Sequence, residues 1–209
     1  MFASGDQHAG APPRDPHRLI YRASNGYDRF QVVMQFADGY DGSIPLTKEY
    51  SEMVSIRSGI VSDVPLLRTL IQEFATFERL PVAITEEQLR QDGFGAQPRF
   101  RILIAECDGQ PAGYALFFEC YSSFQGRGIF LEDLFVRPSL RGKNVGRALL
   151  GHVARMAEEV DGFGVMFNVL DWNQKAIEFY QKIGATFLDD WKTVCLKNKA
   201  LHDLASQIR

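Results

Sequence analysis

Five stretches of the chain carry the strand pattern, in which apolar and polar positions alternate or an apolar run is bounded by turn residues. They are VSIRSG (54–59), FRILIAEC (100–107), GYALFFECY (113–121), GIFLEDLFV (128–136) and FGVMFNVL (163–170). Asp108-Gly109, between the second and the third, is typical of a hairpin turn. Residues 185–187 and 192–196 predict one more hairpin near the C-terminus.

Between these stretches the apolar residues change to the period of a helix. A first helix is predicted around an apolar face made by Leu67, Leu70, Ile71, Phe74 and Phe77, with Ser62-Asp63 as its cap. Thr85-Glu86-Glu87-Gln88 is a capping box for a short second helix that Gly93 and Gly95 end. Helices are also predicted at about 144–160 and 173–183, with Gly184 as the stop of the latter. This order of elements predicts an α/β fold, a mixed sheet with helices packed on it.

The first 52 residues differ from the rest because Gly, Pro and Asp are scattered through them. Such a short stretch rarely builds its own core. We expect a poorly structured N-terminal extension over residues 1–52, and a translation start placed too far upstream gives the same picture. The folded domain is expected over residues 53–198, and residues 199–209 are expected to form a tail or short helix.

Composition narrows the class of protein. A net charge of −3 and a pI near 5.8 argue against general nucleic-acid binding. No stretch approaches the ~20 apolar residues of a membrane span, and the N-terminal residues lack the apolar core of a secretion signal. Cys107, Cys120 and Cys195 are odd in number and lack metal-ligand spacing. We therefore expect a cytoplasmic protein with reduced thiols, no metal, and no nucleic-acid or membrane partner.

The segment FLEDLFVRPSLRGKNVG (130–146) holds the most informative chemistry. A buried strand ends in a short loop, and the loop enters a helix whose unpaired N–H groups and dipole favour an anion. Arg141, Lys143 and Arg147 add positive charge, and Gly142 and Gly146 let a phosphate approach the main chain. The segment predicts a site for a pyrophosphate group.

Four pieces of the chain together resemble the GNAT family of acetyl-CoA-dependent N-acetyltransferases, and within it the diamine (spermidine/spermine) and thialysine acetyltransferases. They are QDGFG (91–95), FLEDLFV (130–136), RGKNVG (141–146) and LDWNQKAIEFYQKIGA (170–185). The resemblance implies a GNAT-like mixed, mostly antiparallel sheet flanked by helices, acetyl-CoA as co-substrate, and a homodimer. For the dimer interface we expect the final hairpin with Phe187, Trp191 and Val194.

The family's phosphate loop has the form R/Q-x-x-G-x-G/A, and Asn144 stands here in place of its first glycine. Asn tolerates a left-handed backbone, but its Cβ lies where a phosphate approaches, which bears on CoA affinity. The residues assigned to acetyl-CoA are Phe135, Val136, Arg141, Gly142, Lys143, Asn144, Val145, Gly146, Asn173 and Lys182. For Asn173 a plain helix N-cap is the alternative, and for Lys182 a solvated surface position.

Acetyl transfer requires a neutral amine, a polarised thioester carbonyl and a proton for the leaving thiolate. The resemblance places the family's catalytic tyrosine on Tyr180, and a phenol with an ordinary pKa of ~10 can protonate a thiolate. The alternative is a packing role for Tyr180 on its helix. Glu132 and Asp133 are adjacent on a strand, so strand alternation predicts that they point to opposite faces. By resemblance Glu132 is the base that acts through water and Asp133 contacts the substrate.

The acceptor amine is the least determined part of the function. Glu78 aligns with an acidic substrate residue of the family, and Phe124 stands where the polyamine enzymes carry a tryptophan. Ser122 replaces an acid of those enzymes, which favours a compact amine such as thialysine over a long polycation. The alternatives are acetylation of a protein lysine or N-terminus, and an acetyl-CoA sensor with weak or no turnover.

Overall fold

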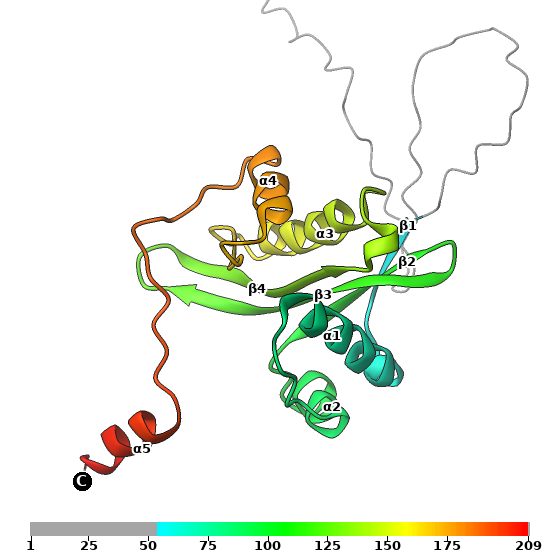
Figure 1. The fold of residues 1–209 in the computed structure, drawn as a ribbon. Coiled ribbons are helices and arrows are strands. Elements are labelled where there is room, and N and C mark those ends of the chain that lie inside the picture. The colour runs from blue at the N-terminus through cyan, green and yellow to red at the C-terminus, as the bar shows by residue number, and fades with distance from the viewer. Residues whose placement is uncertain (1–53, 209) are drawn as a thin grey trace, which may run out of the picture. The chain divides into compact units, whose positions relative to one another are not determined.

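The computed structural model describes residues 54–208, and the predicted N-terminal extension lies outside them. The described residues fall into two compact units, residues 54–167 and residues 168–208. The first unit holds a sheet of β1 (Val54–Ser58), β2 (Arg101–Cys107), β3 (Gln110–Ser122), β4 (Gly126–Val136) and β5 (Val165–Phe167). The strands lie in this order, β1 to β4 antiparallel and β5 parallel to β4 (Figure 1). The predicted mixed, mostly antiparallel sheet is confirmed.

Helices cover both faces of this sheet. Figure 1 shows α1 (Val64–Glu78) and α2 (Glu86–Phe94) on one face and α3 (Val145–Glu159) on the other. Strand alternation sends Ile102 and Ile104 of β2 toward α1, where they are buried with Leu67 and Leu70. Tyr114 of β3 belongs to the same buried cluster. The face under α1 and α2 is therefore a packed core that fixes how α1 lies against β3 and β4.

Several local predictions of the chain's turns and caps agree with the structure. Thr85 and Gln88 form the reciprocal capping box of α2, and Asp108 and Gly109 both have positive φ, 51° and 76°. The predicted cap of the first helix is wrong in detail, because the Asp63 side chain makes no capping hydrogen bond to α1. Asp63 instead accepts the Ile60 N–H and pairs with Arg57 at 2.7 Å. Burial raises the pKa of Asp63, but these bonds outweigh it and hold the pKa below its usual value.

The second unit contains α4 (Gln174–Lys182) and α5 (Asn198–Ser206). The predicted final hairpin is wrong, since the described residues 183–197 contain no strand. Trp191 and Val194 are 78% and 90% exposed, and an isolated hairpin without a packed face is marginal at best. The predicted strand at 163–170 is reduced to the three residues of β5. None of the described helices is long and apolar enough to cross a membrane.

Candidate functional site

The C-terminal half of β4 has one edge without a strand partner among the described residues. Parallel pairing with β5 runs from Ile129↔Val165 to Leu131↔Phe167 and stops there. At the same point the register with β3 shifts, because Leu116 pairs with Asp133 but Phe117 pairs with Leu131. Glu132 is therefore the extra residue of a β-bulge. The prediction that Glu132 and Asp133 point to opposite faces depended on regular strand alternation. Because the bulge interrupts that alternation, strand geometry no longer supports the prediction.

The backbone beyond the bulge presents polar groups to this open edge. Arg137 donates its N–H to Ala112 of β3, and the carbonyl oxygen of Phe135 lies on the β3 side. Because polar groups alternate along a strand, those of Leu134 and Val136 face the open edge. Val136 confirms this, since its carbonyl accepts the Arg141 Nε–H at 2.9 Å. Of the predicted pair, Val136 rather than Phe135 offers its N–H to the open edge.

Three carboxylates gather near the bulge. Asp133 and Glu132 come from β4, and Glu78 is the last residue of α1, which ends where Arg79 turns left-handed at φ 59°. Burial of the Asp133 carboxyl raises its pKa to about 6; the charges of Glu132 and Glu78 add to this, and the Tyr114 hydrogen bond opposes it. Burial also raises the pKa of Glu78. None of the three forms an ion pair within the described part of the chain, so the cluster favours a bound cation.

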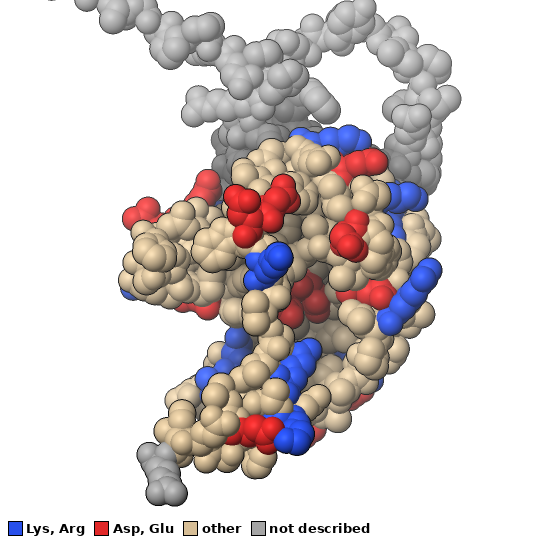
Figure 2. Space-filling view, turned by 60° about the vertical axis from the view of Figure 1, so that its left-hand side comes forward, with Lys and Arg blue, Asp and Glu red and all other residues tan. Residues whose placement is uncertain are grey.

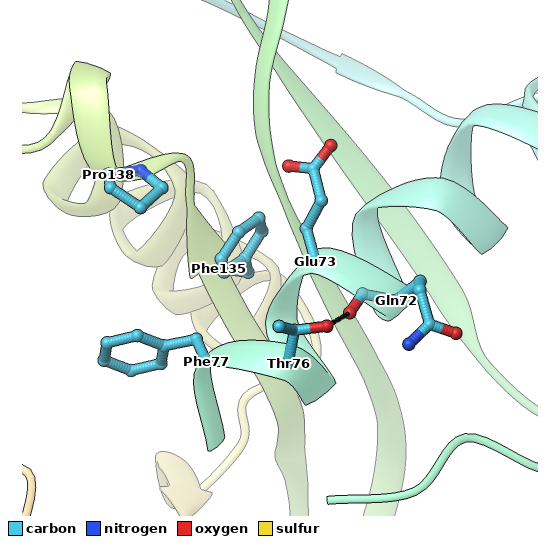
Figure 3. Close-up of a pocket in the computed structure, with 6 residues that line it drawn as sticks. All are labelled: Gln72, Glu73, Thr76, Phe77, Phe135 and Pro138. Carbon is cyan, nitrogen blue, oxygen red and sulfur yellow. Dashed lines mark hydrogen bonds between the residues drawn. The ribbon is translucent and has the colours of Figure 1, made fainter. Parts of the chain in front are cut away.

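An open cavity of about 330 Å³ lies between α1 and the end of β4. Its lining is drawn in Figure 3: Gln72, Glu73, Thr76, Phe77, Phe135 and Pro138. Arg137 holds Glu73 with two hydrogen bonds of 2.8 and 2.9 Å, so the carboxylate of this wall is already neutralised. Phe77 and Phe135 make the cavity mostly apolar. Asp133 is two residues before Phe135 on β4, which places this apolar space beside the carboxylates.

The predicted phosphate loop follows β4 directly. Asn144 is the residue before α3 and has φ 62° and ψ 6°, the left-handed conformation expected for it. Gly142 also has positive φ, 82°, and nothing lies within 4 Å of the position its Cβ would occupy. The first N–H groups of α3 therefore stand at the end of a loop with free space over its main chain. The Arg141 guanidinium lies 4.4 Å from the centre of the Phe77 ring, which connects this loop with α1.

The other predicted residues of the cofactor and catalytic set lie in the second unit. Asn173 is the N-cap of α4, and its side chain accepts the Ala176 N–H at 3.3 Å. Tyr180 is 7% exposed and its ring centre lies 5.3 Å from that of Phe179. Lys182 is exposed in the last turn of α4. The capping alternative for Asn173 is confirmed as a structural role, and its cofactor role stays a prediction.

Phe124 lies apart from the carboxylates within one chain. It is 95% exposed in the turn between β3 and β4, where Ser122 Oγ accepts the backbone N–H groups of Phe124 and Gln125. Asp133 is seven residues beyond the start of β4 at Gly126, which at ~3.3 Å per residue is roughly 20 Å of strand. The structure does not bring Phe124 together with Glu78 and Asp133, and its substrate role stays a prediction.

Sequence reasoning missed Tyr114, whose hydroxyl donates to Asp133 Oδ2 at 2.8 Å. The one available indication was a phenol in the apolar stretch YALFF (114–118) of β3. No three His, Cys, Asp or Glu side chains of residues 54–208 are placed to hold a metal ion. On the face drawn in Figure 2, acidic and basic side chains are interspersed among uncharged ones.

Comparison with known proteins places these features in context. Residues 66–185 match the model of the acetyltransferase (GNAT) family. The chain is 36% identical over 167 residues to thialysine N-epsilon-acetyltransferase of Sus scrofa, covering 74% of this chain and 98% of that protein. It is 28% identical to L-ornithine N5-acetyltransferase of Arabidopsis thaliana, covering 70% and 85%. The fold resembles a solved aminoglycoside N-acetyltransferase in complex with CoA, with a TM-score of 0.57, 19% identity, and 71% and 96% covered.

Proposed function

The chain belongs to the GNAT acetyltransferase family, and on that premise we propose that it moves the acetyl group of acetyl-CoA to a primary amine of a small molecule. The observation that carries the acceptor assignment is the group of three carboxylates without ion-pair partners among the described residues. Such a group attracts an ammonium ion. The relatives named for thialysine and ornithine acetylation act on amino acids with a side-chain amine, which agrees with a compact cationic acceptor.

The loop and the open edge fit coenzyme A. The N–H groups at the start of α3 and the positive charges of Arg141 and Lys143 suit its pyrophosphate. The outward N–H and C=O groups of Leu134 suit its amide-containing arm, because they offer the hydrogen bonds of one more strand. In the second unit Asn173 and Lys182 are proposed as further contacts. When bound, acetyl-CoA supplies the acetyl group as a thioester.

Each proposed catalytic residue has one task. Asp133 and Glu78 hold the ammonium group, and Glu132 at the exposed bulge accepts a proton from it through water, which leaves a neutral amine. The Val136 N–H donates to the thioester carbonyl and polarises it. Tyr180 gives its phenolic proton to the sulfur of the departing thiolate. Most of the rate then comes from positioning amine and thioester against each other.

The test of this function is release of free CoA thiol from acetyl-CoA with a panel of amines. The panel is thialysine, lysine, ornithine, putrescine, spermidine, spermine and a lysine peptide. We expect the highest kcat/KM with thialysine or a short diamine. A preference for the lysine peptide would favour a protein acetyltransferase. CoA binding without release from any amine would favour a sensor.

Asn144 offers a direct probe of the phosphate loop. Because Asn144 is already left-handed, Asn144→Gly keeps the backbone and removes the Cβ from the path of a phosphate. We expect the Kd for acetyl-CoA to fall about threefold, or about 0.7 kcal/mol, as measured by calorimetry. Asn198→Gly, at another left-handed asparagine with φ 50°, is the matched control and should leave the Kd unchanged. Unchanged or weaker binding by Asn144→Gly would place the phosphate elsewhere.

We also propose that the protein is cytoplasmic, which the free cysteines among the described residues support. We further propose a homodimer, supported by apolar side chains that are exposed in the second unit. These are Trp172, Leu188, Trp191, Val194, Leu196, Leu201, Leu204 and Ile208. Light scattering should give a mass about twice the 23.6 kDa of one chain. Trp191→Glu with Val194→Glu should halve it, whereas Ile60→Glu, at an exposed apolar residue of the first unit, should not. A monomeric wild type would refute the dimer.

A further inference from the structure

Tyr114 lies in the core below α1 and reaches the candidate site with its hydroxyl alone. It is 0% exposed and pairs across the strands with Phe135, so Asp133 is its diagonal neighbour on β4. The ring packs in the buried cluster with Leu116 and Phe135. The hydroxyl donates to Asp133 Oδ2 at 2.8 Å. The residue thus joins the apolar core to one carboxylate of the site.

A phenylalanine at position 114 would fill the same space in the core, so the hydroxyl of Tyr114 is not needed for packing. A buried hydroxyl is costly unless it is hydrogen-bonded, and every fully buried side-chain oxygen or nitrogen in residues 54–208 has a partner. For Tyr114 that partner is Asp133. Burial and the charges of Asp133, Glu78 and Glu132 raise the pKa of Tyr114, so its hydroxyl stays protonated and remains a donor.

The other carboxylate oxygen of Asp133 is available to a ligand. Oδ1 has no hydrogen bond or ion pair within the described residues. Every fully buried side-chain oxygen of those residues has a hydrogen-bond partner, so Oδ1 is not fully buried. Oδ1 therefore retains contact with solvent. The charged groups that face Asp133 are Glu132 from its own strand and Glu78 from α1, both acidic, while β3 contributes the Tyr114 hydroxyl. No cationic side chain of the described residues pairs with Oδ1.

Resting on the proposed function, we propose that Tyr114 is a positioning residue for amine recognition, which fixes the Asp133 carboxylate through Oδ2 and leaves Oδ1 to accept the ammonium group. One carboxylate oxygen then serves one ammonium ion, in a fixed direction. Fixing the carboxylate in advance lowers the cost of binding the ammonium group.

The test replaces Tyr114 by Phe, which keeps the ring and its packing. With thialysine as the amine, we expect KM for the amine to rise roughly tenfold, with kcat and KM for acetyl-CoA nearly unchanged. Carboxyl-carbon NMR titration should show the pKa of Asp133 rising above about 6, because the hydrogen bond that lowers it is gone. In an Asp133→Asn background, Tyr114→Phe should cause no further change of KM.

Two controls separate this role from a purely structural one. Tyr121→Phe, at a tyrosine that is 77% exposed on the same strand, should change neither KM nor the Asp133 titration. A merely structural role of Tyr114 would change kcat and both KM values together and would persist in the Asp133→Asn background. An unchanged Asp133 pKa in Tyr114→Phe would overturn the inference. Acetylation of no amine by wild type would overturn the proposed function, and the NMR titration would still decide whether Tyr114 controls Asp133.

Discussion

Tyr180→Phe should lower kcat for acetyl transfer by about 100-fold or more while the Kd for acetyl-CoA stays nearly unchanged. The substitution removes one oxygen atom and its proton, and it keeps the ring of a residue that is 7% exposed. Without the phenol, the thiolate has to leave unprotonated or take its proton from water. The loss should therefore appear in kcat and not in the binding of either substrate. Single-turnover thiol release and calorimetry measure the two quantities.

The matched control is again Tyr121→Phe, which should retain full kcat. A packing role for Tyr180, the alternative that its place on an apolar helix face suggests, would give a different result. In that case Tyr180→Phe would keep its activity because the ring is intact, and Tyr180→Leu would lose thermal stability. Full kcat in Tyr180→Phe would remove Tyr180 from the mechanism.

The elements that sequence predicted correctly are those that local chemistry determines. Thr85 and Gln88 cap α2 by bonds within four residues, and Asp108-Gly109 turns because both residues accept positive φ. Asn144 adopts the left-handed backbone expected for it. In each case the residue type and its immediate neighbours are sufficient, so no knowledge of the remaining fold was needed.

The features that sequence missed depend on register or on packing partners. The bulge at Glu132 arises where β4 loses β5 and shifts against β3, and neither event is visible in FLEDLFV. The Tyr114 hydrogen bond to Asp133 requires knowing which residues face each other across two strands. The predicted final hairpin failed because alternation alone does not form strands when nothing in the described chain covers Trp191 and Val194.

Substitutions of the two acids at the bulge, Asp133 and Glu132, should change different kinetic constants. Asp133→Asn should raise KM for the amine and lower kcat/KM by about 100-fold, because the ammonium group loses one of its two anionic partners and keeps only Glu78. Glu132→Gln should act chiefly on kcat, because it removes the acceptor of the amine proton. The isosteric amide in Asp133→Asn can still accept the Tyr114 hydrogen bond, so the local packing is kept.

The pH dependence of KM for the amine is an independent test of the role of Asp133. The pKa of Asp133 is raised to about 6, so its carboxylate is ionised above that pH and protonated below it. Wild-type KM for the amine should therefore rise as pH falls through about 6, and Asp133→Asn should reduce this rise to the part that Glu78 contributes. The raised pKa also means that ionised Asp133 destabilises the folded state at pH 7, a cost relieved as pH falls from about 6 toward 3.8. Asp133→Asn should consequently be as stable as wild type or more stable at pH 7 in urea unfolding. A raised KM for the amine without loss of stability would identify Asp133 as a binding residue, whereas a less stable Asp133→Asn would mean that the carboxylate serves the fold.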